Sequence, residues 1–427
     1  MTACSKVSGE FFLAARLQSV RGTHDILPEE ARKFRRVVET FRAVAERYAF
    51  GEIATPIFEF TEVFSRSLGE ATDVVTKEMY TFTDRSGDSI TLRPEYTAGI
   101  ARAFLSNGLQ QEAPCRFYAW GPMFRHERPQ KGRLRQFHQL DVEIIGVAEA
   151  QADVELLALA YDLLSELGVA DKVTLELNTL GDHESRARYR DALVKYFSAH
   201  VSTLSEDSRL RLDKNPLRIL DSKDAGDRAI INNAPLFTDY LNEASLAFFA
   251  DVKRGLEALH IPYKVNPRLV RGLDYYTHTA FEFTTEALGA QGTVLAGGRY
   301  DGLIEELGGP ATPGVGWASG IERLSMLIGN LESGPRPIAV IPVGAATQDT
   351  ALVIAHDARR AGHIVDMSYR GNMGKRLTRA NKLRARAAVI VGEDELARGV
   401  IVIRDLDAGT QTEVPRDRLV AALDAFR

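Results

Sequence analysis

The sequence predicts an α+β domain, an antiparallel sheet flanked by helices, followed by a smaller α/β domain. Residues 116–127 and 133–146 are two long alternating stretches around a polar, basic loop, as in paired antiparallel strands. Residues 34–48 repeat apolar side chains at three- and four-residue spacing, which predicts a long helix packed on something large. Beyond residue 337, strand-like runs alternate with helical ones, which is the pattern of a parallel sheet.

Length and composition exclude several classes of protein. The chain has 427 residues and a formal net charge of −5, so local basic patches would have to bind any nucleic acid. No apolar run approaches the roughly 18 residues that a membrane span needs. Two cysteines, Cys4 and Cys115, are too few for a disulfide framework or a thiolate zinc site. We therefore expect a cytoplasmic protein with no membrane contact and no site for a bound metal in the pattern of its histidines and cysteines.

The first elements follow from local signals. Residues 1–20 carry a short apolar run without the basic segment of a signal peptide, so we interpret them as an N-terminal leader. Pro28 suits the first turn of a helix over residues 28–48. An extended segment at 51–60 and a hairpin at 79–93 precede the two long strands.

The remaining elements complete two domains. After the long strands we expect a helix, a strand, a helical insertion with weak apolar stripes, further extended segments, and a glycine-rich strand that runs into a helix. They cover residues 149–168, 173–178, about 183–255, 268–298 and 314–330. Gly, Ser and Pro at 329–337 predict a linker. The sequence thus predicts a first domain at 21–328 and a second at 338–427.

The loop between the long strands is strongly basic. Its charged residues are Arg125, Arg128, Lys131, Arg133 and Arg135 against Glu127, which sums to 5 − 1 = +4. Residues two apart share a strand face, so Arg133, Arg135 and Phe137 are expected to project together. Guanidinium groups bind phosphate oxygens in pairs, and a purine can stack on Phe137, which favours a nucleoside triphosphate. The alternative is a solvated hairpin rim with surface ion pairs.

Polar residues continue along the second long strand. Gln139, Asp141 and Glu143 follow at a period of two, which is unusual for a face that packs into a core. They predict a pocket for a small cationic or hydrogen-bond-donating ligand beside the phosphates; the alternative is an exposed sheet face. Glu95 and Thr97 lie at another junction of strand and helix, where a carboxylate that caps the helix explains them equally well.

Two further segments carry charged and phenolic groups. An extended stretch contains Arg271, Asp274, Tyr275, Tyr276 and His278, a cluster of low specificity by itself. The glycine-rich residues 314–324 precede a helix that bears Arg323, but their spacing matches neither the dinucleotide fingerprint nor the phosphate loop. No nucleophile elbow or metal-ligand spacing occurs in the sequence.

The second domain contains a basic run without any acid. Between residues 370 and 386 the basic residues are Arg370, Lys375, Arg376, Arg379, Lys382, Arg384 and Arg386. Arg376, Arg379 and Lys382 are three apart and are expected near one helix face. Such a face suits a phosphate backbone, and the alternative is a solvated helix.

Taken together, these strings resemble one family. FRHERPQKGRLRQFHQLDVEIIG looks like motif 2 of class II aminoacyl-tRNA synthetases, GVGWASGIERL looks like motif 3, and the long helix with GEIATP looks like motif 1. RLVRGLDYYTHTAFEF resembles the signature peptide of histidyl-tRNA synthetases. RGTHDILP and GNMGKRLTRANKLRA are similar too, so the resemblance runs from about Val20 to the end.

The resemblance implies a fold, a reaction and partners. It implies a class II catalytic domain with a helical insertion, a C-terminal anticodon-binding α/β domain, and a homodimer. The implied reaction joins L-histidine and ATP into histidyl-adenylate with Mg²⁺ and then transfers the histidyl group to the histidine tRNA. Such adenylation needs positioning and cations more than a general base.

The resemblance also implies roles for individual residues. The implied catalytic residues are Arg125, Arg271 and Arg323. Those implied to bind histidine are Glu95, Thr97, Arg125, Gln139, Glu143, Arg271, Tyr275 and Tyr276. Those implied to bind ATP are Arg125, Arg133, Arg135, Phe137 and Arg323. Those implied to bind tRNA are Arg128, Gln130, Arg370, Lys375, Arg376, Arg379 and Lys382.

Some questions stay open at the level of sequence. Tyr96 stands where many members of the family carry glycine, and its side chain either points away from the pocket or reshapes it. A regulatory subunit of histidine biosynthesis with the same fold is an alternative, although such paralogues usually lack the anticodon domain and motif arginines. A synthetase for proline, threonine or glycine is opposed by RGLDYY and by Gln139 and Glu143.

Overall fold

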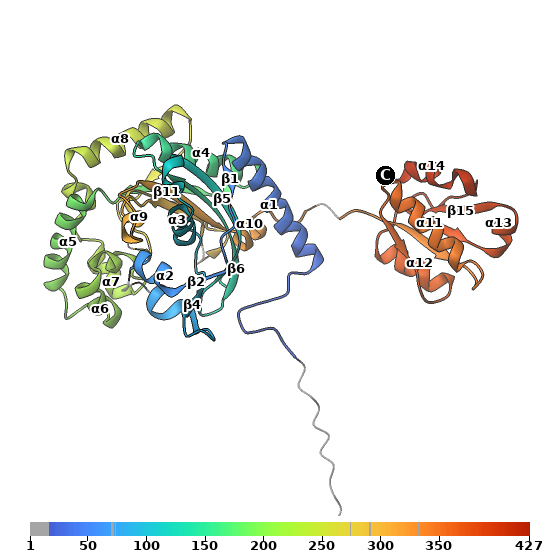
Figure 1. Ribbon diagram of the computed structural model, residues 1–427, viewed down its shortest axis with the longest axis horizontal. Coiled ribbons are helices and arrows are strands. Elements are labelled where there is room, and N and C mark those ends of the chain that lie inside the picture. Colours follow the sequence, from blue (N-terminus) through green and yellow to red (C-terminus); the bar gives the residue numbers. More distant parts are fainter. Residues whose placement is uncertain (1–16, 70–71, 73, 274, 290–291, 332–333) are drawn as a thin grey trace, which may run out of the picture. The chain divides into compact units, whose positions relative to one another are not determined.

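A computed structural model describes residues 17–69, 72, 74–273, 275–289, 292–331 and 334–427. The leader expected at residues 1–20 therefore lies mostly outside the described residues. The chain forms two compact units, residues 1–329 and 330–427, which are coloured from blue to orange and from orange to red in Figure 1. Among the described residues, no helix has the length and apolar character needed to cross a membrane.

A mixed eight-stranded sheet forms the centre of the first unit. Its strand order is β1-β5-β6-β11-β10-β9-β7-β8. The strands are β1 (Gly51–Glu52), β5 (Cys115–Phe124), β6 (Gln136–Ile145), β7 (Thr174–Thr179), β8 (Lys264–Val265), β9 (Thr277–Thr284), β10 (Thr293–Arg299) and β11 (Gly314–Gly320). Neighbouring strands are antiparallel except β1 with β5 and β7 with β8 at the two edges. Long connections that contain helices allow these two parallel pairings.

One face of this sheet is covered by helices that share a single hydrophobic core. They are α1 (Pro28–Arg47), α4 (Ala150–Glu166), α8 (Glu243–Ala258) and α10 (Ile321–Leu327). Helix α1 buries Phe34, Val37, Phe41 and Val44, the stripe that its sequence predicts. Proline opens the helix, where its missing N–H costs no hydrogen bond.

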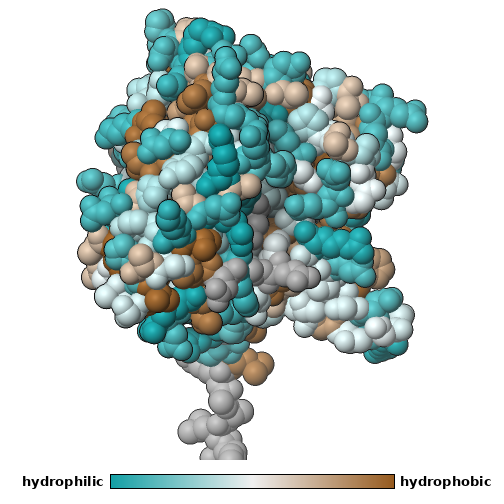
Figure 2. Space-filling model, turned by 90° about the vertical axis from the view of Figure 1, so that its left-hand side faces the viewer, coloured by the Kyte–Doolittle hydropathy of each residue, from teal (hydrophilic) through white to brown (hydrophobic). Residues whose placement is uncertain are grey.

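The opposite face carries α3 (Thr97–Ser106), α9 (Leu303–Glu306) and a small sheet in the order β2-β4-β3. The strands of this small sheet are β2 (Phe58–Phe60), β3 (Tyr80–Thr83) and β4 (Ser89–Leu92), and α2 (Thr61–Ser67) follows β2. Helices α5 (His183–Ser198), α6 (Glu206–Lys214) and α7 (Ala225–Ile231) extend this side. Figure 2, which faces this end of the first unit, shows hydrophilic side chains with hydrophobic patches among them.

The segment expected as one insertion, about 183–255, does not pack as one block. Its last helix, α8, buries Phe249, Val252 and Leu256 in the core that contains α4, on the other face of the main sheet. The helices approach closely at Gly255, where an added Cβ would lie 2.6 Å from a methyl carbon of Val154. This contact is not readable from the weak stripes of the neighbouring helices.

The second unit is a five-stranded sheet in the order β13-β12-β14-β15-β16. Strands β12 (Ile338–Pro342), β13 (Val365–Met367) and β14 (Ala387–Val391) are parallel, as the alternating pattern predicts, whereas β15 (Val400–Asp405) and β16 (Gln411–Pro415) add an antiparallel hairpin. Helices α11 (Gln348–Arg360) and α14 (Leu419–Leu423) cover one face. Helix α12 (Met373–Lys382) covers the other, and the short α13 (Glu393–Ala397) follows β14.

Candidate active site

A cavity of about 380 Å³ lies over β6, β9, β10 and β11. It gathers residues that the sequence analysis drew from four separate segments. They are Glu95, Thr97, Arg125, Arg133, Phe137, Gln139, Arg271, Tyr275, Tyr276 and Arg323. Strand β6 explains part of this gathering, because Leu140, Val142 and Ile144 point into the core under α1 and the intervening residues must point the other way.

Glu143 lies behind two hydroxyl groups of the cavity wall. The Thr97 hydroxyl donates to its Oε1 at 2.6 Å, and the Tyr300 hydroxyl donates to its Oε2 at 2.5 Å. Burial raises the pKa of Glu143 to about 8, although both hydrogen bonds oppose this rise. Gly316 makes room for the carboxyl group, since a Cβ there would lie 1.6 Å from Oε2. Glu143 itself is not among the lining residues, but its two donors are.

Glu95 and Tyr96 have separate tasks at the start of α3. The Glu95 carboxylate accepts from the backbone N–H groups of Thr97 and Ala98 at 2.9 and 2.8 Å, which caps the helix. Burial raises its pKa. Tyr96 points away from the cavity: its hydroxyl donates to the Trp120 carbonyl at 2.6 Å, and the Arg93 guanidinium lies 4.1 Å from its ring centre.

Three guanidinium groups, those of Arg125, Arg133 and Arg323, lie close together on the cavity wall. Arg125 donates to the Pro94 carbonyl at 2.8 Å and lies 5.3 Å from the ring centre of Phe137. Arg323 donates to the carbonyls of Gly132 and Thr293 at 3.2 and 2.5 Å. Burial, followed by the positive charges of Arg133 and Arg125, lowers the pKa of Arg323. Cations held this close together favour a polyanionic ligand.

Arg271 is held by a partner that the sequence analysis did not name. Its guanidinium forms an ion pair with Glu282 on β9 and lies 5.5 Å from the ring centre of Tyr276. Glu282 also accepts from the Thr293 hydroxyl at 2.8 Å. Asp274, the neighbour considered from sequence, lies outside the described residues. Glu282 and Glu322, which accepts from the backbone of His138 at 2.9 Å, both line the cavity.

The expectation that Arg133, Arg135 and Phe137 share one strand face is wrong. Strand β6 begins only at Gln136, so the two arginines lie in the preceding loop. Arg133 pairs with Glu127 and lines the cavity with Phe137. Arg135 instead donates to the Glu127 carbonyl at 3.2 Å and packs on Gly22, where an added Cβ would lie 2.7 Å from its side chain.

The other expected tRNA contacts lie outside the cavity. Arg128 and Gln130 are exposed in the loop before β6. On and before α12, Arg370, Lys375, Arg379 and Lys382 are exposed, and Arg379 bonds both oxygens of Asp366 at 3.1 and 2.8 Å.

Arg376 does not fit the expected phosphate surface. Its side chain is buried and its guanidinium donates to the Pro342 carbonyl at the end of β12. It faces the sheet because Ala380, one turn later, packs into the same core.

Comparison with known proteins identifies the family. The family model "Histidyl-tRNA synthetase" matches residues 22–324, and the "Anticodon binding domain" model matches residues 337–425. The chain belongs to the histidyl-tRNA synthetase family. The match to this family model contains every lining residue of the cavity, whereas helix α12 lies in the part that matches the anticodon-binding model.

Relatives match over nearly the whole chain. A histidine–tRNA ligase of Rhodospirillum rubrum is 63% identical over 94% of this chain and 97% of its own length. That of Gluconacetobacter diazotrophicus is 54% identical over 95% of this chain and 98% of its own. The structure of apo S. aureus histidyl-tRNA synthetase is similar with a TM-score of 0.80 at 34% identity, and the match covers 95% of this chain and 99% of that one.

Proposed function

We propose that this protein is a class II aminoacyl-tRNA synthetase that ligates L-histidine to the histidine tRNA through a histidyl-adenylate. The observation that carries the proposal is the cavity, whose wall combines Arg125, Arg133 and Arg323 with Thr97 and Tyr300, the two hydroxyl donors to the buried carboxyl group of Glu143. Such a site suits a ligand with an imidazole at one end and a triphosphate at the other. Family membership over residues 22–324 supports the same reaction.

The part of the cavity next to Glu143 binds histidine in this proposal. Tyr275 and Tyr276 on the cavity wall, with Glu143 buried behind Thr97 and Tyr300, would offer the two imidazole nitrogens buried hydrogen-bond partners. Gln139, Thr97 and Glu95 hold the α-amino group. Analogues without matching donors would leave these buried groups unpaired, and that cost is the source of specificity.

The part of the cavity lined by the three guanidinium groups binds ATP in this proposal. Phe137 supplies a ring for the adenine, Arg125 and Arg323 bind phosphate oxygens, and Arg133 lies beside them. Attack of the histidine carboxylate on the α-phosphorus develops negative charge between the two reactants, and Arg271 provides the positive charge there. Glu282 fixes the position of Arg271, because their ion pair leaves the guanidinium little freedom.

Mg²⁺ is proposed to enter with ATP. The described residues contain no cluster of three or more histidine, cysteine or acidic side chains that could hold a metal. Mg²⁺ is commonly held by phosphate oxygens, waters and one or two carboxylates. Glu282 and Glu322 on the cavity wall fit that role, and the ion would supply charge neutralisation on the triphosphate.

The second unit and one loop of the first are proposed to bind the tRNA. Arg370, Lys375, Arg379 and Lys382 form an exposed basic surface, and Arg128 and Gln130 would meet the acceptor end. We place the reaction in the cytoplasm. We also propose a homodimer, since Phe58, Phe60, Phe82 and Trp120 expose apolar surface on the first unit.

Exchange of pyrophosphate into ATP that depends on the amino acid tests this function. Histidine alone among the common amino acids should drive the exchange, and Glu143→Ala should lower kcat/KM by about tenfold to a thousandfold. Comparable exchange with proline or threonine would overturn the assignment. Absence of exchange with every amino acid would favour the regulatory subunit instead.

A further inference from the structure

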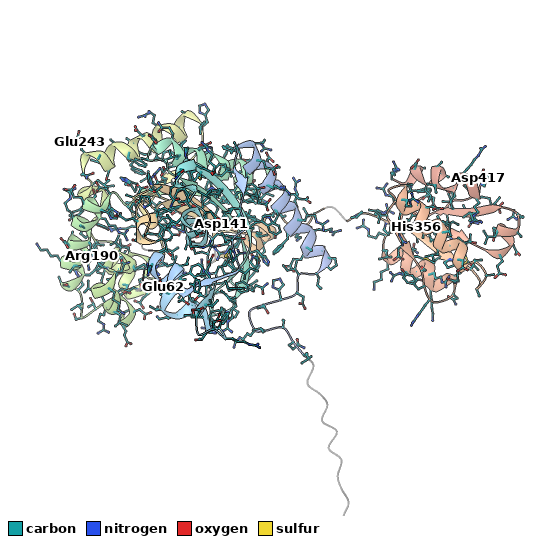
Figure 3. All side chains as sticks on the ribbon, viewed as in Figure 1. Glu62, Asp141, Arg190, Glu243, His356 and Asp417 are labelled. Carbon is teal, nitrogen blue, oxygen red and sulfur yellow. The ribbon has the colours of Figure 1, made fainter. Side chains whose placement is uncertain are left out.

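Asp141 is a buried acid without a hydrogen-bond partner. It lies on β6 between Gln139 and Glu143, with 0% of its surface exposed, and neither carboxyl oxygen has a partner among the described residues. Figure 3 shows it inside the first unit, whereas Arg190 and Glu243 lie at the periphery. Buried polar atoms are almost always hydrogen-bonded, and burying an unpaired charge is costly. Asp141 therefore either keeps a proton or balances a cation that arrives with a ligand.

Asp141 lies in the sheet next to residues that line the cavity. Its cross-strand neighbours are Ala119 on β5 and Ala318 on β11, both of which have small side chains. Ala318 and Gln139 both line the cavity. The Gln139 Oε1 atom is likewise buried without a partner. Two acceptors without donors thus lie on the same face of one strand.

The charges around Asp141 would be balanced by one additional cation. Its ionisable neighbours are Glu143 on the same strand, Arg93, Glu95 and Tyr96 between β4 and α3, and Arg125 after β5. Three carboxyl groups therefore face two guanidinium groups. If every acid were ionised, this buried cluster would carry a net charge of one negative unit, 2 − 3 = −1.

We propose that Asp141 is the counter-charge of the histidine α-ammonium group, and that Asp141 releases a proton when histidine binds. In the free protein Asp141 holds this proton, and Glu143 keeps a separate proton of its own because burial raises its pKa as well. The ammonium group then replaces the Asp141 proton, which leaves to solvent. Asp141 acts through Gln139 and the cavity floor, so it is a positioning residue. The inference rests on the proposed function.

The electrostatics of the free site support a stored proton. Burial raises the pKa of Asp141 well above its usual range, and the negative charges of Glu143 and Glu95 raise it further. Thr97 and Tyr300 donate to Glu143, whereas nothing donates to Asp141 among the described residues. The unbonded acid is the one whose neutral form is favoured.

Calorimetry of the full-length protein measures the proton directly. Titration with L-histidine at about pH 7.5 in phosphate and in Tris should show release of roughly half to one proton per histidine, because the imidazole of histidine is already neutral there. Imidazolepropionate, which is histidine without its amino group, should bind without releasing a proton. Histidine affinity should accordingly rise with pH between about 7 and 8.5, while that of imidazolepropionate stays constant.

Asp141→Asn separates this role from a packing role. The amide has the same shape but no charge, so histidine should bind about tenfold more weakly (~1.4 kcal/mol), its proton release should vanish, and affinity for imidazolepropionate should not change. Histidine binding to the wild type without proton release would overturn the inference but leave the proposed function intact. Release that persists in Asp141→Asn would also overturn it. Failure of histidine to bind at all would instead contradict the proposed function.

Discussion

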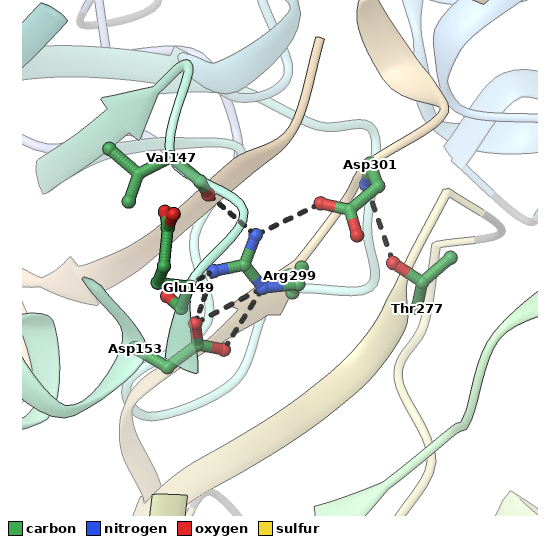
Figure 4. A network of polar contacts seen from close by, with 6 residues as sticks. All are labelled: Val147, Glu149, Asp153, Thr277, Arg299 and Asp301. Carbon is green, nitrogen blue, oxygen red and sulfur yellow. Dashed lines mark hydrogen bonds and ion pairs between the residues drawn. The ribbon is translucent and has the colours of Figure 1, made fainter. Parts of the chain in front are cut away.

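Arg299 in the first unit and Arg398 in the second form ion pairs of similar geometry in opposite surroundings. Arg299 is fully buried and bonds Asp153, Asp301 and the carbonyls of Val147 and Glu149 (Figure 4). Arg398 bonds both oxygens of Glu413 at 2.9 and 2.7 Å, yet these two side chains are 55% and 47% exposed.

The difference extends to the two proposed binding surfaces. The arginines of the cavity are held by buried carbonyls and carboxylates before any ligand arrives, whereas the charges on α12 mostly face solvent. Loss of one partner from a buried pair leaves an uncompensated charge, but water replaces a lost partner at the surface. Proposed ligand binding in the cavity should therefore depend on the exact position of each charged group. Proposed tRNA binding by the second unit should depend mainly on how many basic side chains it exposes.

The largest effect is expected from the buried pair itself. Asp153→Ala leaves the Arg299 guanidinium without its main counter-charge and should lower the free energy of unfolding by about 3 kcal/mol or more. The urea midpoint of the full-length protein, followed by circular dichroism, measures this change. A urea midpoint equal to that of the wild type would contradict the claim that loss of a partner is costly in the buried Asp153–Arg299 pair.

Arg271→His comes next, because it removes one pre-positioned cation from the proposed reacting centre. Single-turnover formation of histidyl-adenylate, followed by rapid quench, should slow by roughly a hundredfold or more (~2.7 kcal/mol), with a smaller change in histidine binding. Arg398→His in the other unit is the matched control and should leave the rate unchanged. A proportional loss of binding, rate and thermal stability would show that Arg271 only holds the RGLDYY segment.

Burial of Glu143 should make stability depend on pH. The folded protein holds the Glu143 proton up to a pKa of about 8, whereas the unfolded chain releases it near 4.5. The stabilising contribution is thus complete below about pH 4.5 and is lost as the pH rises towards 8, by up to ~1.4 kcal/mol per pH unit. Urea unfolding of wild type and Glu143→Gln across this window should show a flatter profile in the variant. Parallel profiles would exclude Glu143 as the titrating group.

The exposed charges of α12 should act weakly and through salt. Lys375→Ala with Lys382→Ala should raise the KM for tRNA by about tenfold and make the dependence of tRNA binding on salt less steep by roughly two counterions. Histidine-dependent exchange of pyrophosphate into ATP should not change, which is the internal control. An unchanged KM for tRNA at low salt would remove α12 from the proposed tRNA surface.

The smallest effect is expected at the exposed pair. Glu413→Ala removes both hydrogen bonds to Arg398, but solvent reaches both groups, so the urea midpoint should stay within the error of the wild-type value. Glu413→Ala and Asp153→Ala both remove the acid of an arginine–carboxylate pair. The difference between their urea midpoints therefore measures the effect of burial most directly. A loss in Glu413→Ala as large as that in Asp153→Ala would contradict the role assigned to burial.

The sequence predicts most of the fold because periodicity is local. The apolar stripe of α1, the alternation in β5 and β6, and the strand–helix alternation of the second unit each occupy one continuous segment. The same alternation places Gln139, Asp141 and Glu143 on one strand face, opposite Leu140 and its apolar neighbours.

The sequence does not predict which side chains from distant segments contact each site residue. Glu282 meets Arg271 only because β9 folds back beside it, and Arg376 is buried only because β12 lies under α12. Arg135 shows a different limit, because strand alternation does not extend into the loop before Gln136: Arg133 still lines the cavity with Phe137, but Arg135 does not. A signal for Glu282 existed in the alternation of AFEF on its strand, but nothing local tied it to Arg271.

The absence of a side chain at Gly316 has a consequence for inhibitors and resistance. Resistance to a compound that mimics the imidazole would ordinarily arise by enlarging a residue that contacts it. At position 316 even a methyl group would collide with Glu143, on which the natural substrate is proposed to depend. We therefore expect that a substitution at Gly316 that blocks a compound in contact with its backbone would also displace Glu143 and weaken the proposed binding of histidine.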